Sequence, residues 1–100
     1  MTAGGEAAER ASLRALVRGR VQGVNFRQFV HTRAKFLRLN GYVSNLDDGQ
    51  TVEVVAEGLR ADLEQLLEYV REGPRSARVK EVEVEWGGAT ERWTDFGFVP

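Results

Sequence analysis

One short segment of the chain, residues 19–27, carries residue types that suit the binding of an anion. Gly19 and Gly23 frame a loop between an alternating apolar stretch and a helical pattern, and Arg27 falls in the first turn of the expected helix. A cation at a helix N-terminus opposes the helix macrodipole, typically by about 0.3–1 kcal/mol. Loop amides and the helix end carry partial positive charge of their own. An anion bound between them and Arg27 would remove this conflict, so the segment predicts a phosphate or carboxylate site.

The loop that precedes Arg27 admits two interpretations from its residues alone. Its backbone N–H groups suit a nest around three phosphoryl oxygens, with Val24 and Phe26 anchoring the loop in the core. The simpler alternative is a plain strand-to-helix connection in which Gly23 supplies the turn geometry. The loop residues concerned are Gln22, Gly23, Val24, Asn25 and Phe26.

Arg27 and Asn45 are the side chains best suited to handling a phosphoryl group. A guanidinium offers a planar fork of donors for phosphate oxygens, although a surface ion pair, for example with Glu53, is the simpler explanation of an arginine. Asn45 precedes the Asp47–Gly49 turn and has a simple explanation as a turn-entry residue. Its amide can also accept from water and donate to an oxyanion, which suits the placing of a nucleophile. His31 falls on the polar side of the expected helix, where we predict a surface histidine without a catalytic role.

Composition narrows the class of protein. The chain has 100 residues, no cysteine and one histidine, which fits one domain without disulfides or a multi-histidine metal site. Lys and Arg total 14 against 15 Asp and Glu, so nucleic acid is not an expected partner. No apolar run approaches the roughly 20 residues of a membrane span, and the first residues lack the basic and apolar parts of a signal peptide. We expect a monomer in the cytoplasm with no membrane partner.

Apolar periodicity assigns secondary structure to most of the chain. Leu13, Ala15 and Val17 alternate with polar residues, which predicts a strand. Helical spacing begins at Phe26 and is expected to stop at Asn40–Gly41, because glycine tolerates a left-handed cap. The remaining predicted elements are strands at 42–46, 51–57, 79–86 and 96–99 and a helix at 60–72 that ends at Gly73–Pro74.

The order of these elements predicts the fold. A βαββαβ order, with a short strand at the end, is that of a ferredoxin-like α/β sandwich in the α+β class. We expect an antiparallel sheet with two helices on one face. Residues 1–11 lack apolar periodicity and are expected to form a flexible tail, which leaves residues 12–100 as a single domain.

Two motifs bring a known family into view. Val21–Arg27 resembles the signature loop of the acylphosphatases, and Gly41–Asn45 resembles their second signature. The two motifs occur in the family's order and at its separation, and the resemblance extends from about Leu13 to Phe98. Where the sequence departs from the family pattern, the departures are Asn25 in the loop, Arg38 in place of a common glycine, Tyr42 in place of a common tryptophan, and a missing second proline after Pro74.

The resemblance implies an activity and roles for particular residues. Acylphosphatases are small ferredoxin-like enzymes that hydrolyse carboxyl-phosphate mixed anhydrides to carboxylate and inorganic phosphate, without a metal or cofactor. By this likeness the substrate is a small-molecule acyl phosphate, Arg27 and the amides of residues 22–26 hold its phosphoryl group, and Asn45 orients the attacking water.

Other functions remain open at this point. A non-catalytic module for phosphate or another anion needs Arg27 and the loop but not Asn45. An RNA-binding domain of this fold carries aromatic and basic residues on its central strands, whereas residues 51–57 are acidic and lack aromatics. Larger carbamoyl-transfer proteins carry an acylphosphatase-like first domain, but the length of this chain favours a free-standing hydrolase.

Overall fold

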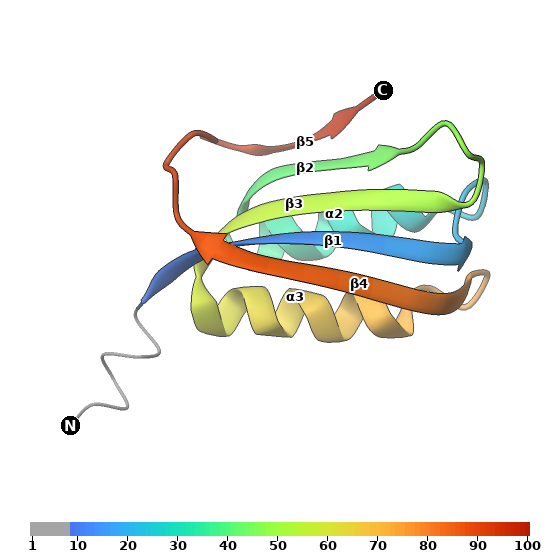
Figure 1. Cartoon of the computed structure of the whole chain (residues 1–100), viewed down its shortest axis with the longest axis horizontal. Coiled ribbons are helices and arrows are strands. Elements are labelled where there is room, and N and C mark those ends of the chain that lie inside the picture. Colours follow the sequence, from blue (N-terminus) through green and yellow to red (C-terminus); the bar gives the residue numbers. More distant parts are fainter. Residues whose placement is uncertain (1–8) are drawn as a thin grey trace.

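The computed structural model of the chain describes residues 9–100, and Figure 1 shows how its elements are arranged. Within these residues the elements are β1 (Arg10–Arg20), α2 (Phe26–Phe36), β2 (Asn40–Asn45), β3 (Thr51–Leu59), α3 (Arg60–Glu72), β4 (Arg78–Gly88) and β5 (Phe96–Val99). Each predicted strand and helix is present, and α3 occupies its predicted range. The periodicity of apolar residues was therefore a sufficient guide to the order of elements.

The first strand starts earlier than predicted. β1 begins at Arg10, within the expected tail of residues 1–11. Ala11 is buried and pairs with Gly58 of β3 and Gly88 of β4, so it belongs to the sheet. Residues 1–8 of the expected tail lie outside the described residues.

The five strands form one sheet in the order β4–β1–β3–β2–β5. β1 pairs antiparallel with β3 and β4, and β2 pairs antiparallel with β3, as the βαββαβ order requires. At one edge the expectation of an antiparallel sheet was wrong, because β5 runs parallel to β2. After β4 the chain crosses the end of the sheet to the opposite edge, and β5 then points toward the end where the β1–α2 loop lies (Figure 1).

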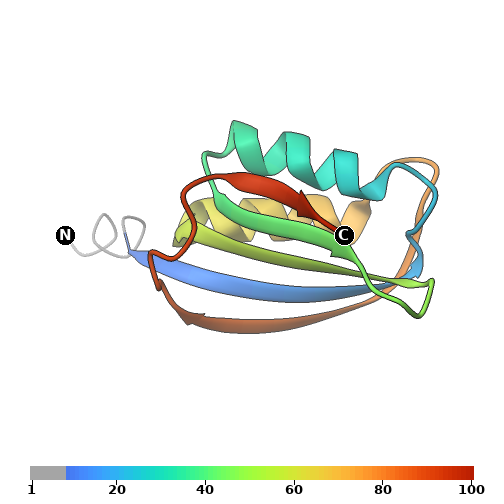
Figure 2. The same cartoon turned by 90° about the horizontal axis from the view of Figure 1, so that it is seen from above.

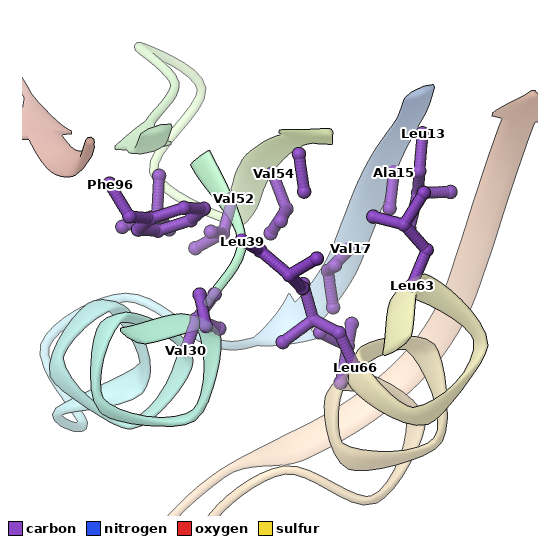
Figure 3. Packing of buried hydrophobic residues seen from close by; sticks show 14 of the residues in the cluster. Leu13, Ala15, Val17, Val30, Leu39, Val52, Val54, Leu63, Leu66 and Phe96 are labelled. Carbon is purple, nitrogen blue, oxygen red and sulfur yellow. The ribbon is translucent and has the colours of Figure 1, made fainter. Parts of the chain in front are cut away.

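Both helices cover the same face of the sheet (Figure 2). The core lies between them and the strands, where Val17 of β1, Val30 of α2 and Leu66 of α3 meet (Figure 3). These three side chains are fully buried, and burial of each such side chain stabilises the fold by about 1.5–3 kcal/mol. The helical faces predicted from sequence are therefore the faces that form the core.

Helix α2 does not end where the sequence predicted. It ends at Phe36, and Arg38 adopts the left-handed conformation with φ 60°. This position explains why a glycine is common there in the family that the sequence resembles. Gly41 instead lies within β2 with φ 141°, where an added Cβ would sit 1.9 Å from the carbonyl oxygen of Val55. Gly41 is thus required by the close approach of β2 to β3 and not by a helix cap.

A buried carboxylate holds the crossover between β4 and β5 on the sheet. Glu57 of β3 is only 3% exposed and accepts hydrogen bonds from the backbone N–H groups of Thr90 (3.0 Å) and Glu91 (2.9 Å) and from the Thr90 hydroxyl. Burial raises the pKa of Glu57, but these hydrogen bonds outweigh it and hold the pKa below its ordinary value. The charged form of Glu57 therefore stabilises the folded chain.

Replacing Glu57 by glutamine should lower the free energy of unfolding at pH 7 by about 1–3 kcal/mol, because the anion is lost and an amide N–H group faces a backbone donor. The folded-state pKa is depressed, so the stabilisation is complete above the ordinary value of 4.5 and is lost as the pH falls below it. The difference between wild type and Glu57→Gln in urea denaturation should therefore shrink from pH 7 to pH 3. Glu81→Gln, at an exposed carboxylate, is the control; parallel stability curves for wild type and Glu57→Gln would contradict the assignment.

Candidate active site

The β1–α2 loop, the end of β2 and the α3–β4 connection meet at one end of the sheet around an open cavity of ≈ 570 Å³. Figure 1 shows these segments at the same end of the molecule. Arg27 and Asn45, which sequence analysis singled out, both line this cavity. The described residues that line it are Val21, Gly23, Val24, Asn25, Phe26, Arg27, Gln28, Asn45, Ser76 and Phe98.

The loop backbone has the geometry of an anion nest. Gly23 has φ 72° and Asn25 has φ 65°, and between them Val24 has no positive φ. When left-handed and right-handed backbone conformations alternate along a loop, successive N–H groups point toward the same side, where they can surround an anion. An added Cβ at Gly23 would meet no atom within 4 Å, so conformation and not space calls for glycine there. Asparagine is among the few other residue types that adopt the left-handed region readily, which suits it to position 25.

The N-terminus of α2 opens on the same cavity without an anion of its own. Asn25 occupies the N-cap position, but its side chain makes no capping hydrogen bond, and the first turn holds no acidic residue. The bond from the Phe29 N–H to the Asn25 carbonyl (3.1 Å) leaves the preceding N–H groups without helical partners. Three of these preceding residues, Phe26, Arg27 and Gln28, line the cavity. Partial positive charge therefore gathers where the loop and the helix meet.

Arg27 adds a full positive charge at this point. Within residues 9–100 no ion pair or side-chain hydrogen bond engages its guanidinium. The alternative partner considered from sequence, Glu53, instead accepts from Arg14 (2.7 Å) and from the Tyr42 hydroxyl (3.1 Å). The simple ion-pair explanation of Arg27 with Glu53 was therefore wrong, and the guanidinium is available to an anion in the cavity.

Asn45 carries a buried oxygen without a hydrogen-bond partner. Its Oδ1 atom is inaccessible and unpaired among the described residues, a state that typically costs about 1–3 kcal/mol. One other buried side-chain atom there lacks a partner, Nε of Arg33, but that guanidinium lies 3.7 Å from the ring centroid of Phe29 and gains a cation–π contact. Asn45 has no such compensation, so an unpaired buried polar atom remains in a residue of the cavity wall.

The turn after Asn45 does not use its side chain. Oδ1 of Asp48 accepts from the backbone N–H groups of Gln50 and Thr51, each at 2.9 Å, and the Thr51 hydroxyl donates to the same carboxylate. Asp48 therefore closes the turn, as the sequence predicted for this residue. The alternative that Asn45 serves only as a turn-entry residue finds no hydrogen bond to support it.

Hydrogen bonds tie the β1–α2 loop to the β2–β3 hairpin on one side and to the α3–β4 connection on the other. Nε2 of Gln22 donates to the carbonyl oxygens of Leu46 (2.8 Å) and Thr51 (2.9 Å), which ties the loop to the β2–β3 hairpin. On the other side, the Ser76 hydroxyl donates to the Val24 carbonyl at 2.8 Å. The Gln22 side chain is thus turned toward the hairpin, so this residue can reach an anion only through its backbone.

Four residues of the cavity wall lie outside the predicted site: Val21 and Gln28 flank it in the sequence, and Ser76 and Phe98 lie far from it. The burial of His31 was also underestimated. Ser76 and Phe98 come from segments far from the two motifs, and no local pattern marks either as part of a site. His31 is half-buried rather than fully exposed, because its ring stacks on Phe98 with centroids 4.5 Å apart and planes 16° apart. The terminal strand that brings Phe98 to the cavity was predicted, but its pairing partner could not be.

Metal-binding groups and membrane-spanning helices are both missing from the described part of the chain. Across residues 9–100, no three or more His, Cys, Asp or Glu side chains gather as a group that could hold a metal ion. In the same region neither helix combines the length and the apolar character needed to cross a membrane.

Comparison with known proteins assigns the family. Residues 13–98 match the family model of the acylphosphatases. An acylphosphatase of Dehalococcoides mccartyi is 51% identical over 84 residues, which are 84% of this chain and 92% of that protein. An acylphosphatase of Thermus thermophilus is 56% identical over 73 residues, covering 73% and 82% of the two chains. The crystal structure of acylphosphatase from Bacillus subtilis superposes with a TM-score of 0.86 at 38% identity, covering 90% of this chain and 99% of that one. The chain belongs to the acylphosphatase family.

Replacing Gln22 by alanine should weaken phosphate binding without removing any group that touches the anion. Loss of its two hydrogen bonds should lower the free energy of unfolding by about 1–3 kcal/mol and free the loop from the hairpin. Titration calorimetry with inorganic phosphate, together with urea denaturation, measures both effects. Gln65→Ala, an exposed glutamine on α3, should change neither, and an unaltered phosphate affinity in Gln22→Ala would show that the loop needs no tie to the hairpin.

Proposed function

We propose that this protein hydrolyses acyl phosphates to a carboxylate and inorganic phosphate at the cavity between the β1–α2 loop and β2. The observation that carries the proposal is the meeting, in the lining of one cavity, of the unpaired guanidinium of Arg27, an uncapped helix N-terminus and Asn45. The family relationship supports the reaction class, and the geometry supports the division of labour among the residues.

In this mechanism Arg27 and the loop amides bind the phosphoryl group. The guanidinium donates from a planar fork that matches two phosphoryl oxygens, while the N–H groups of residues 22–26 and the first turn of α2 donate to the third. These donors are already aligned by the positive φ values of Gly23 and Asn25. Preorganised donors stabilise charge that shifts during the reaction without a cost of reorientation at that moment.

Asn45 orients the water that attacks phosphorus. Its side-chain amide lines the cavity and hydrogen-bonds the water, which directs an oxygen lone pair of the water at the phosphoryl group. The P–O bond to the acyl carboxylate breaks as the bond from water forms, and the proton of the water passes to a phosphoryl oxygen. The products are a carboxylate and inorganic phosphate, so atoms and charge balance without a titrating base on the enzyme.

The substrate's own chemistry makes so small a set of groups sufficient. A carboxylate leaves readily because its conjugate acid has a pKa near 4, so no general acid is needed. Phosphoryl transfer depends chiefly on positioning and charge stabilisation, and these are what an arginine, a loop and an amide supply. Because the proposed roles need only Arg27, Asn45 and the loop of one chain, we also propose that the protein acts as a monomer. It would act on a small molecule in the cytoplasm, a compartment that its lack of cysteine permits, with no nucleic-acid partner.

Asn45→Ala and Arg27→Ala should each lower kcat/KM for benzoyl phosphate by about 10²–10³, the usual effect of removing one preorganised donor or acceptor. Asn45→Ala should leave the affinity for inorganic phosphate nearly unchanged, because Asn45 acts on water, whereas Arg27→Ala should weaken it. Stopped assays of phosphate release and calorimetry with phosphate make the two measurements.

Asn40→Ala, at the other end of β2, and Arg20→Ala, at the exposed end of β1, are the matched controls. Near-wild-type turnover in Asn45→Ala or Arg27→Ala would remove that residue from the mechanism. Turnover at the background rate in the wild type, with phosphate still bound, would instead favour an anion-binding module.

Hydrolysis should proceed unchanged after dialysis against EDTA and in its continued presence. The proposed mechanism assigns the stabilisation of phosphoryl charge to Arg27 and backbone N–H groups, so a chelator has nothing to remove. A fall in rate that Mg²⁺ or Mn²⁺ restores would overturn this part of the proposal.

A further inference from the structure

Phe98 is an apolar side chain held in an unusual place. It is 47% exposed on β5, and it lines the cavity that also contains Arg27 and Asn45. The other large apolar side chains exposed among the described residues, Phe36, Leu59 and Val99, do not line this cavity. An aromatic ring beside a phosphate-binding site contributes nothing to holding the phosphate, so its position calls for another explanation.

The ring of Phe98 is fixed by its neighbours. The imidazole of His31 stacks on it, with the ring centroids 4.5 Å apart. The His31 ring also packs edge-on against the buried ring of Phe96, with centroids 6.1 Å apart. In the strand pairing Phe98 lies opposite Val43, two residues before Asn45 on β2. His31 follows Arg27 by one helical turn, so both project from the same side of α2. These contacts hold the Phe98 ring in the wall of the cavity that Arg27 and Asn45 also line.

The cavity is larger than a phosphate. The open cavity measures ≈ 570 Å³ and is lined by residues of the β1–α2 loop, α2, β2, the α3–β4 connection and β5. A phosphate ion, with about five heavy atoms, therefore fills only part of the space. The acyl portion of an acyl phosphate, joined to the phosphoryl group through one oxygen, must occupy the space that remains.

We propose that Phe98, backed by His31, forms a subsite for the acyl group and gives the enzyme a preference for acyl phosphates with aromatic or bulky apolar acyl groups. The inference rests on the proposed function and specifies its substrate class. An aryl group can pack against the exposed part of the Phe98 ring and against the half-buried Val24 on the loop. An acetyl group is too short to gain much from this surface, so the ring separates the two kinds of substrate.

The test compares two substrates and two matching inert analogues. Hydrolysis of benzoyl phosphate and acetyl phosphate gives kcat and KM, and calorimetry gives the affinities for benzoylphosphonate, acetylphosphonate and inorganic phosphate. In Phe98→Ala we expect KM for benzoyl phosphate and Kd for benzoylphosphonate to rise about tenfold, equivalent to about 1.4 kcal/mol. KM for acetyl phosphate and Kd for acetylphosphonate and inorganic phosphate should stay within about twofold of wild type, because these smaller ligands gain little from contact with the Phe98 ring.

Two further variants keep the result specific. Phe98→Leu retains an apolar side chain on β5 and should lose part of the preference for the benzoyl compounds, which keeps the test available if the alanine variant is poorly folded. Phe36→Ala removes a ring that is 80% exposed at the far end of α2, and it should alter none of the values.

Other outcomes would overturn the subsite. An equal loss of affinity for benzoyl, acetyl and inorganic phosphate compounds in Phe98→Ala would mean that the ring only supports the phosphate site through β5. Unchanged values for all ligands would mean that the ring does not contact the acyl group.

A separate outcome distinguishes the subsite from the proposed reaction. If the wild type hydrolyses neither acyl phosphate but shows a preference for benzoylphosphonate that depends on Phe98, the hydrolase proposal fails and the subsite stands.

Discussion

Positive charge gathered without a neutralising carboxylate is the constraint on which this end of the molecule depends. Arg27, the first turn of α2 and the left-handed loop at Gly23 and Asn25 line the same cavity, and residues 9–100 supply none of them with an acidic partner there. Such an arrangement disfavours folding until an anion binds, because a cation opposes the helix dipole. It persists because Gln22 and Ser76 hold the loop to the hairpin and to the α3–β4 connection at 2.8–2.9 Å.

The loop and the β2–β3 hairpin consequently behave as one structural unit. Gln22 reaches the carbonyl oxygens that flank the turn, and Asp48 closes that turn from the other side. Asn45 lies just before the hairpin turn, so hydrogen bonds of Gln22 and Asp48, neither of which lines the cavity, set its position relative to the β1–α2 loop. Destabilising the hairpin should therefore affect the chemistry as well as the fold.

Local sequence patterns were enough to predict the order of strands and helices. The end of α2 and the more distant parts of the cavity wall depend on tertiary contacts. The helical period of α3 followed from the spacing of Leu63, Leu66, Leu67 and Val70, and its end followed from Gly73–Pro74. The end of α2 could not be found this way, because Gly41 looks like a cap in sequence and is in fact needed where β2 approaches β3. Arg27 and Asn45 were identified through motifs. Ser76 and Phe98 carry no motif, and their places depend on the packing of the α3–β4 connection and on the parallel pairing of β5.

The kinds of side chain in the cavity also limit which phosphoryl compounds the proposed mechanism can hydrolyse. Its described wall consists of an arginine, amides, a hydroxyl and apolar groups, and a neutral amide orients water without taking its proton. A leaving group that needs protonation, such as the alkoxide of a phosphate monoester, would depart slowly from such a site, and monoester hydrolysis is among the slowest uncatalysed reactions. A carboxylate departs unaided. Selectivity for the mixed anhydride thus follows from the neutral character of Asn45, while Arg27 and the loop supply the affinity that any phosphoryl group would share.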